Sequence, residues 1–170
     1  MIDRVLIAAF LCLAGATLKA SADSGPEVAI GAPLQEAMLT GLNGPSRRLS
    51  TYRGKPLLIN VWASWCGPCK QEMASLERLA WREQSRYFAI IGISTDDEAD
   101  RALSFLKTSN ATISHFIDRG LAMEHMLGAT RLPLTVLVDA DGRILEKVYG
   151  ARQWDAPEAL RLIDRTFRKH

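Results

Sequence analysis

Cysteine is scarce in this chain, with three thiols among 170 residues: Cys12, Cys66 and Cys69. Tetrahedral zinc needs four ligands, so the cysteines alone cannot complete a zinc site. The sequence also lacks a long low-complexity segment, and 48% of its residues are hydrophobic. A chain of this length has enough material for one ordinary globular core and not comfortably for two, so one domain is expected.

An excess of charge of either sign is missing as well. The net charge is +2, and no basic block carries interleaved aromatic residues, so we expect no nucleic-acid partner. Four cations, Arg161, Arg165, Arg168 and Lys169, make the last predicted helix basic. Cations near the C-terminus of a helix complement its dipole, which explains them without a ligand.

An apolar run long enough to span a bilayer is absent from the N-terminal segment. Residues 5–18 are apolar, about 14 residues where roughly 20 are needed. Arg4 precedes the run, and the small residues Ala20-Ser21-Ala22 follow it at the positions that a signal peptidase reads. We interpret residues 1–22 as a secretory signal cleaved after Ala22, with an uncleaved anchor as the alternative, and residues 23–170 as the mature domain.

The motif Trp65-Cys66-Gly67-Pro68-Cys69 follows an apolar run at residues 57–62 that predicts a buried strand. Two thiols therefore lie where a strand turns into a helix. Unpaired N–H groups and the helix dipole stabilise a thiolate at a helix N-terminus, which predicts that Cys66 is the nucleophile. Cys69 returns to the same helical face, close enough for a short disulfide, and should be the more buried, resolving cysteine.

Two other uses of the cysteine pair stay open. His115 and His125 could complete a two-Cys, two-His zinc site, although their spacing of ten residues exceeds the usual three to five. A purely structural disulfide is the second alternative, although closing so small a loop removes little chain entropy. Export to a compartment that oxidises thiols favours a redox pair that either donates oxidising equivalents or is kept reduced by a donor.

The rest of the chain alternates between strand and helix patterns. Asp96 is predicted to cap the second helix, Gly128 to end a short one, and Asp141-Gly142 to turn a hairpin. The expected strands are 37–42 and 47–50 as an N-terminal hairpin, 55–63, 87–94, 113–117, 134–138 and 144–149, and the expected helices are 66–82, one after Asp96, 121–127 and one from 155 onward. This order predicts an α/β fold with a mixed sheet and helices on both faces.

The stretch from Asn60 to Glu72 resembles the exported TlpA/ResA-type thiol-disulfide oxidoreductases of the thioredoxin superfamily, and the resemblance covers roughly residues 27–167. It implies the thioredoxin fold, a central mixed β-sheet flanked by helices, with an N-terminal β-hairpin and a central βα insertion after the strand that ends near Ile93.

The resemblance also implies a role for Glu72. Cytosolic thioredoxins carry a buried acid six residues before the first cysteine, where this chain has Asn60, as ResA-like proteins do. Glu72 occupies the position that the ResA-like group fills with a functional glutamate, and it would take and return the proton of Cys69. The alternative is a surface glutamate paired with a nearby Lys or Arg.

Leu132-Pro133 falls where the family places a cis-proline facing the cysteines, although a trans-proline in a loop is the ordinary alternative. The backbone of Leu132 would then pair with an incoming substrate like an added strand. Trp65, together with Gly67 and Pro68, would offer the substrate an apolar patch, whereas Trp62 is expected in the core.

The resemblance implies a periplasmic reductase of protein disulfides, with a Cys66/Cys69 dithiol-disulfide cycle and no metal or other cofactor. Gly-Pro between the cysteines resembles thioredoxin, at the reducing end of the potential scale. Expected partners are protein thiols and disulfides, such as those of apocytochrome c or copper-site assembly, and a membrane electron donor of the CcdA/DsbD type. A disulfide oxidase or isomerase, a thiol peroxidase and a metal-binding carrier remain alternatives.

Overall fold

The computed structural model describes residues 26–82 and 86–168. The predicted signal at residues 1–22, with Cys12, lies outside the described residues, so its cleavage or retention stays a prediction. In the described part of the chain, no helix has the length and apolar character that crossing a membrane requires.

Apart from one short helix, the strands and helices follow one another in the order that the sequence predicts; the predicted strand 47–50 ends at Arg48, and a 3₁₀ helix that was not predicted begins at Leu49. They are β1 (Met38–Gly41), β2 (Arg47–Arg48), the 3₁₀ helix η1 (Leu49–Tyr52), β3 (Leu57–Trp62), α1 (Gly67–Trp81), β4 (Ala89–Ser94), α2 (Ala99–Thr108), β5 (Ser114–Ile117), α3 (Ala122–Leu127), β6 (Leu134–Val138), β7 (Ile144–Tyr149) and α4 (Pro157–Arg168). The described ends differ from the expected ones by a few residues, as helix and strand ends commonly do.

The strands form one mixed sheet of seven strands in the order β2-β1-β5-β4-β3-β6-β7. β3, β4 and β5 run parallel, and β6, β7, β1 and β2 join them through antiparallel pairings. β3 lies inside the sheet with all six residues buried, which explains its continuous apolar pattern. The strand that leads to the cysteines therefore has neighbours on both sides.

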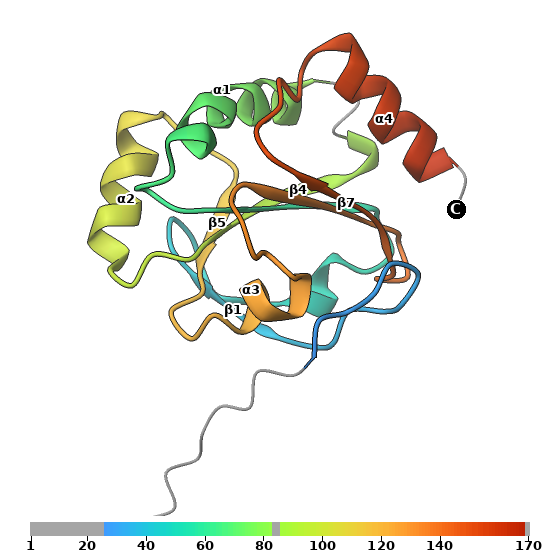
Figure 1. The fold of residues 1–170 in the computed structure, drawn as a ribbon, viewed down its shortest axis with the longest axis horizontal. Helices are drawn as coiled ribbons and strands as arrows, with labels where there is room; N and C mark the ends of the chain where they lie inside the picture. Colours follow the sequence, from blue (N-terminus) through green and yellow to red (C-terminus); the bar gives the residue numbers. More distant parts are fainter. Residues whose placement is uncertain (1–25, 83–85, 169–170) are drawn as a thin grey trace, which may run out of the picture.

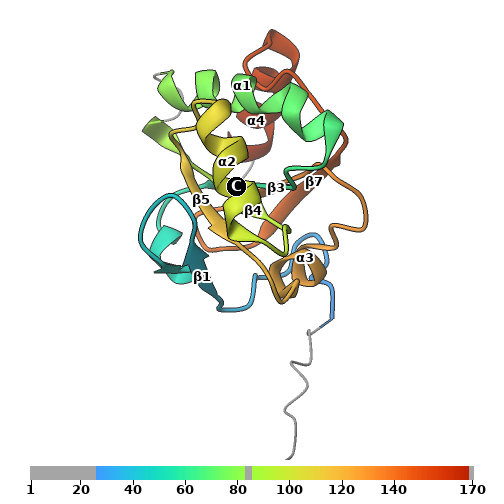
Figure 2. The same cartoon turned by 90° about the vertical axis from the view of Figure 1, so that its left-hand side faces the viewer.

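Helices cover both faces of this sheet (Figures 1 and 2). On one face α1, α2 and α4 pack, with Leu58 of β3 against Leu76 of α1 and Ile163 of α4 in one core cluster. On the other face lie α3 and the N-terminal segment, where Ile59 of β3 joins Met123 in a second cluster. Alternate residues of β3 therefore serve different cores, since successive side chains of a strand point to opposite faces.

The N-terminal hairpin and the central insertion are both confirmed. β1 pairs antiparallel with β2 and also with β5, so the hairpin extends the edge of the sheet. Between β4 and β6 the chain adds α2, β5 and α3, and β5 pairs in parallel with β4. The α/β thioredoxin-type sheet predicted from the sequence is thus present.

The predicted cap of α2 is wrong. Glu98 occupies the N-cap position, without a side-chain hydrogen bond to the helix. Asp96 lies before the helix begins, and its carboxylate accepts hydrogen bonds from Ser64 and Ser94 instead. A carboxylate satisfied by these serines is not available to the first turn of α2.

Candidate active site

The two cysteines lie at the carboxyl edge of the parallel strands, where β3 gives way to α1. Cys66 is the N-cap residue of α1, and Cys69 lies in its first turn. They form a disulfide, with their Cα atoms 5.3 Å apart. Cys66 is 5% exposed and Cys69 is 0% exposed, so Cys69 is the more buried of the pair, as its deeper position in the helix predicts.

The start of α1 stabilises negative charge on Cys66. Its Sγ accepts a hydrogen bond from the backbone N–H of Cys69 over 3.2 Å. The first turn of α1 contains no acidic residue, and Pro68 has no N–H to leave unsatisfied there. Once the disulfide is reduced, this arrangement favours the thiolate form of Cys66 because N–H dipoles point at the sulfur.

The surface beside the cysteines is partly apolar. Trp65 is 69% exposed, and Gly67 and Pro68 are exposed next to it. Trp62, in contrast, is fully buried and belongs to the same cluster as both cysteines, which confirms its expected place in the core. The side chain of Trp65 therefore leaves an apolar area exposed beside the disulfide.

The Leu132-Pro133 bond is cis, as the resemblance implies. Leu132 is half-buried against the cluster that contains Cys66 and Cys69, and Pro133 is buried just before β6 begins. The carbonyl of Pro133 accepts from the N–H of Gly150, whereas no other described residue bonds to the backbone of Leu132. The Leu132 backbone thus keeps a donor and an acceptor available beside the cysteines.

Glu72 is buried, so the alternative of a surface glutamate paired with a cation is wrong. Its side chain is 1% exposed and accepts three hydrogen bonds. Asn60 Nδ2 donates to Oε1 over 2.7 Å, while Trp154 Nε1 and the backbone N–H of Arg152 donate to Oε2 over 3.0 and 3.1 Å. The carboxyl group therefore joins α1 to β3 and to the segment before α4.

The pKa of Glu72 is raised above its usual value. Burial has the largest effect and disfavours the charged form, while the hydrogen bonds from Asn60, Arg152 and Trp154 partly oppose it. A carboxyl group with a raised pKa lies closer to the pKa of a thiol than an exposed glutamate does. It is therefore better matched to exchange a proton with a cysteine.

Asp96 is a site residue that the sequence analysis assigned to a different role. Its carboxylate is buried and accepts from the backbone N–H and the hydroxyl of Ser64, over 2.9 and 2.7 Å. Ser64 lies two residues before Cys66, so Asp96 holds the loop that leads to Cys66. The sequence could have indicated this, because Asp96 comes just after β4 as Cys66 comes just after β3. Parallel strands end at the same edge of a sheet, so residues that follow them lie near one another.

Trp154 and Arg152 carried no sequence signal, because their contacts with Glu72 span about 80 residues and depend on how α4 returns to the sheet. They come from the segment between β7 and α4. Periodicity identifies which residues are buried in one element, but it does not identify long-range partners.

The two histidines of the alternative zinc site lie in different environments. His115 is buried in β5, where its Nδ1 accepts from Trp62 Nε1 over 3.1 Å. His125 is exposed on α3, which covers the opposite face of the sheet from α1. Within residues 26–82 and 86–168, no three His, Cys, Asp or Glu side chains are grouped so that they could hold a metal ion.

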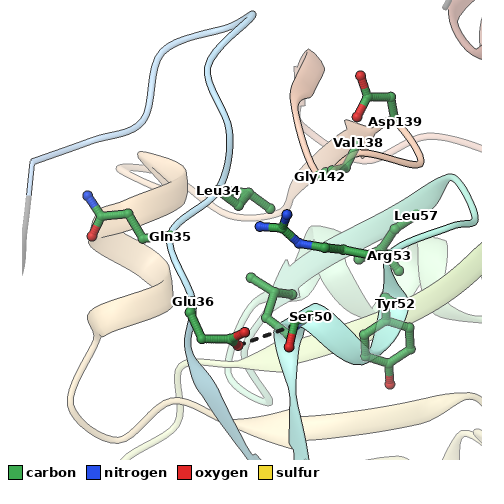
Figure 3. A pocket seen from close by; sticks show the side chains of 11 residues that line it. Leu34, Gln35, Glu36, Ser50, Tyr52, Arg53, Leu57, Val138, Asp139 and Gly142 are labelled. Atoms are coloured by element: carbon green, nitrogen blue, oxygen red, sulfur yellow. Dashed lines mark hydrogen bonds between the residues drawn. The ribbon is translucent and has the colours of Figure 1, made fainter.

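A small cavity of about 20 Å³ lies between the N-terminal segment, η1 and the hairpin of β6 and β7 (Figure 3). Leu57 and Val138 line it, and both lie at the end of the sheet opposite to the cysteines. This volume holds about one water molecule. It is too small for a substrate, and at its edge Glu36 accepts a hydrogen bond from the Ser50 backbone.

A larger, open groove of about 460 Å³ borders the active site, between the loop before Cys66 and the helix α2. Ser64, Lys70 and Phe105 line it, and the Lys70 ammonium lies 6.0 Å from the centre of the Phe105 ring. The surface beside the cysteines is therefore hollowed on the side where α2 lies.

Known proteins resemble this chain over most of its length. The Redoxin family profile matches residues 21–163. The thiol-disulfide oxidoreductase ResA of Bacillus cereus is 29% identical over 152 residues, which cover 88% of this chain and 88% of that protein. The thiol:disulfide interchange protein DsbE of Pseudomonas aeruginosa is 33% identical over 148 residues, 82% of this chain and 80% of that protein.

A solved structure supports the fold. The crystal structure of a Chlorobium tepidum protein, described as a thiol:disulfide interchange protein DsbE, matches with a TM-score of 0.75 and 23% identity over 82% of this chain and 99% of that one. The chain therefore belongs to the Redoxin family, in the thioredoxin superfamily, and is a thiol-disulfide oxidoreductase of the ResA/DsbE type.

Proposed function

We propose that the protein is an exported reductase of protein disulfides that works through a dithiol-disulfide cycle of Cys66 and Cys69. The observation that carries the proposal is the position of Cys66 Sγ at the N-terminus of α1, in a hydrogen bond with the Cys69 N–H, above the fully buried Cys69. Cys66, which is 5% exposed where Cys69 is 0% exposed, is also the cysteine whose thiolate the helix stabilises.

The cycle has two exchange steps. The Cys66 thiolate attacks one sulfur of a substrate disulfide, so a Cys66–substrate bond forms and the other substrate sulfur leaves as a thiolate. The Cys69 thiol then loses its proton and attacks Cys66 Sγ, which forms the Cys66–Cys69 disulfide and releases the second substrate sulfur. Two electrons pass from the protein to the substrate, and an external dithiol donor later returns them.

Glu72 is the proton acceptor for Cys69 in this proposal. It follows Cys69 by three residues on one helical face, it is buried, and burial raises its pKa toward that of a thiol. A Glu72→Gln variant should slow the second step and remove one limb of its pH profile. An unchanged profile would reduce Glu72 to a structural residue and leave the cysteine cycle intact.

The substrate is expected to lie along Leu132 and Pro133, with the backbone N–H and C=O of Leu132 pairing with an extended segment. Trp65, Gly67 and Pro68 would contact the other side of that segment. An added strand aligns the substrate through main-chain hydrogen bonds, so many sequences could be accepted. The apolar surface of Trp65 would then favour disulfides flanked by hydrophobic residues.

Residues 1–22 would direct the mature domain, residues 23–170, to the periplasm, either free after cleavage or held at the inner membrane by residues 5–18. In that compartment the cysteine pair needs a dedicated source of electrons, for which a membrane donor of the CcdA/DsbD type is suited. Apocytochrome c and copper-site assembly proteins are the proposed substrates, as the resemblance to TlpA/ResA-type proteins implies.

The redox potential of the mature protein tests the direction of electron flow. Equilibration with glutathione should give a potential near that of thioredoxin, about −270 mV, and a value near −120 mV would instead indicate an oxidase. Peroxide consumption by the reduced protein would indicate a peroxidase. A stoichiometric metal on the reduced protein would indicate a carrier.

The roles of the two cysteines are tested by trapping. A Cys69→Ala variant should accumulate mixed disulfides with substrate proteins, because nothing resolves the bond to Cys66. The matched Cys66→Ala variant should trap none, because the nucleophile is missing and Cys69 is buried. Equal trapping by both variants would contradict the assignment.

A further inference from the structure

Asn60 has an unusual set of partners. It is 1% exposed in β3, and its Nδ2 donates to Glu72 Oε1 over 2.7 Å and to Thr135 Oγ1 over 3.1 Å. Its Oδ1 is also buried, yet no described residue bonds to it. Buried polar side-chain atoms nearly always have a partner, so this oxygen calls for an explanation.

The three partners of Glu72 suit only its ionised form. All three present N–H groups to the carboxylate oxygens, and a proton on either oxygen would meet an N–H. The Trp154 indole and the Arg152 backbone N–H cannot accept a hydrogen bond. Asn60 alone among these partners has an acceptor to offer, the unpaired Oδ1, and its amide faces Glu72 Oε1.

We propose that the Asn60 side-chain amide turns over when Glu72 takes up a proton, so that Asn60 Oδ1 accepts from the new O–H on Glu72 Oε1. This inference rests on the proposed role of Glu72 as the proton acceptor of Cys69. Thr135 remains a partner in both orientations, since its hydroxyl accepts from Nδ2 in one and donates to Oδ1 in the other. Asn60 is therefore a positioning residue that adapts the site to both protonation states.

Each orientation leaves one end of the amide unpaired, Oδ1 in the first and Nδ2 in the second. Both orientations of the Asn60 amide therefore carry the desolvation cost of one unpaired end. The protonation state of Glu72 decides which orientation is the more stable. An aspartate at position 60 would not behave in this way, because two neighbouring carboxyl groups would share one proton.

Few titratable groups face Glu72 from the elements around it. From β3 it meets the neutral Asn60 side chain, which in turn bonds to Thr135 of β6. From the segment before α4 it meets the Trp154 indole and the backbone of Arg152, whose side chain is exposed. On α1 itself, Cys69 lies one turn earlier. The proton that reverses Asn60 is thus the one that Cys69 gives up before it attacks Cys66.

Nuclear magnetic resonance of the reduced, full-length protein tests the reversal. The Glu72 carboxyl carbon reports its titration. Above the midpoint, a scalar coupling through the hydrogen bond should join Asn60 Nδ2 to the Glu72 carboxyl carbon, and below the midpoint that coupling should vanish. Asn43 is the matched control, because its amide donates to Ile113 and accepts from the His115 N–H and should not change.

A Glu72→Gln variant provides the second measurement. The new amide oxygen can accept from Trp154 and Arg152, which leaves the new NH₂ group to donate toward Asn60, as a protonated glutamate would. Asn60 should then hold the reversed orientation at every pH. The expected sign is a coupling from the Nε2 of the substituted side chain to the Asn60 side-chain carbonyl carbon.

The possible failures are distinguishable. A coupling from Asn60 Nδ2 that persists below the Glu72 midpoint, or Asn60 keeping its present orientation in Glu72→Gln, would overturn the reversal even if the pH profile of exchange confirms Glu72 as proton acceptor. Conversely, reversal of Asn60 together with an exchange profile that Glu72→Gln leaves unchanged would support the inference and refute the proposed role of Glu72.

Discussion

Trp154 donates its indole N–H to Oε2 of Glu72 over 3.0 Å, which joins the segment before α4 to the helix that carries both cysteines. The backbone N–H of Trp154 also bonds to the hydroxyl of Ser75, one turn after Glu72, over 3.0 Å. The indole is fully buried. The position of the buried carboxyl group thus depends on a residue 82 positions away in the sequence.

Replacing Trp154 with phenylalanine removes this donor while keeping an aromatic ring. The charged form of Glu72 loses a hydrogen bond, so its pKa should rise further and the pH profile of thiol-disulfide exchange should move upward with it. The free energy of unfolding should fall by about 2 kcal/mol. Trp81→Phe is the matched control, because Trp81 is 77% exposed, and both quantities should stay unchanged in it.

Replacing Asp96 with asparagine should loosen the loop before Cys66. Asp96 accepts from Ser64 twice and from Ser94 once, and an amide turns at least one of these acceptors into a donor. We expect a loss of about 2 kcal/mol in urea unfolding and slower attack by Cys66. The exposed neighbour gives the control Asp97→Asn, and an equal loss there would show that Asp96 has no special role.

Acid should destabilise the fold through His115. Burial lowers its pKa from 6.5 to about 3, and its Nε2 has no partner among the described residues. In the unfolded chain, His115 therefore takes up a proton as the pH falls below about 6.5. In the folded protein, it takes up this proton only near pH 3. The free energy of unfolding is therefore highest above pH 6.5 and decreases as the pH falls toward 3, by at most about 5 kcal/mol from this group.

The variant His115→Asn isolates this effect. Asparagine keeps an acceptor for Trp62 Nε1 but does not titrate, so the decline between about pH 6.5 and 3 should become shallower. Urea midpoints of both proteins across this range give the difference. An identical slope in the variant would mean that other groups cause the acid sensitivity.

Gly92 should tolerate no side chain. A Cβ there would collide with the ring of His115 and lie 2.9 Å from Trp62 Nε1, in the tightly packed cluster behind the cysteines. Gly92→Ala should therefore reduce the free energy of unfolding by about 3 kcal/mol. Gly120→Ala is the control, since nothing lies within 4 Å of its added Cβ, and it should unfold like the parent protein.

The local sequence determined the features of this protein that depend on neighbouring residues. The apolar run of β3, the Gly-Pro pair that begins α1, the Asp141-Gly142 hairpin and the end of α3 at Gly128 all follow from period, turn chemistry and capping. The greater burial of Cys69 was predicted too, because Cys69 lies further into the helix than Cys66.

Tertiary structure alone decided which distant residues meet. The partners of Glu72 and the attachment of Asp96 to Ser64 depend on how strands and helices return to one edge of the sheet. An acid just before a predicted helix is expected to cap that helix on local grounds. Only the fold shows that Asp96 instead accepts hydrogen bonds from Ser64, a residue of another loop. Hydrogen bonds between distant segments form where the packing of the core brings donor and acceptor together. A local sequence pattern does not indicate which distant residues will be close in space.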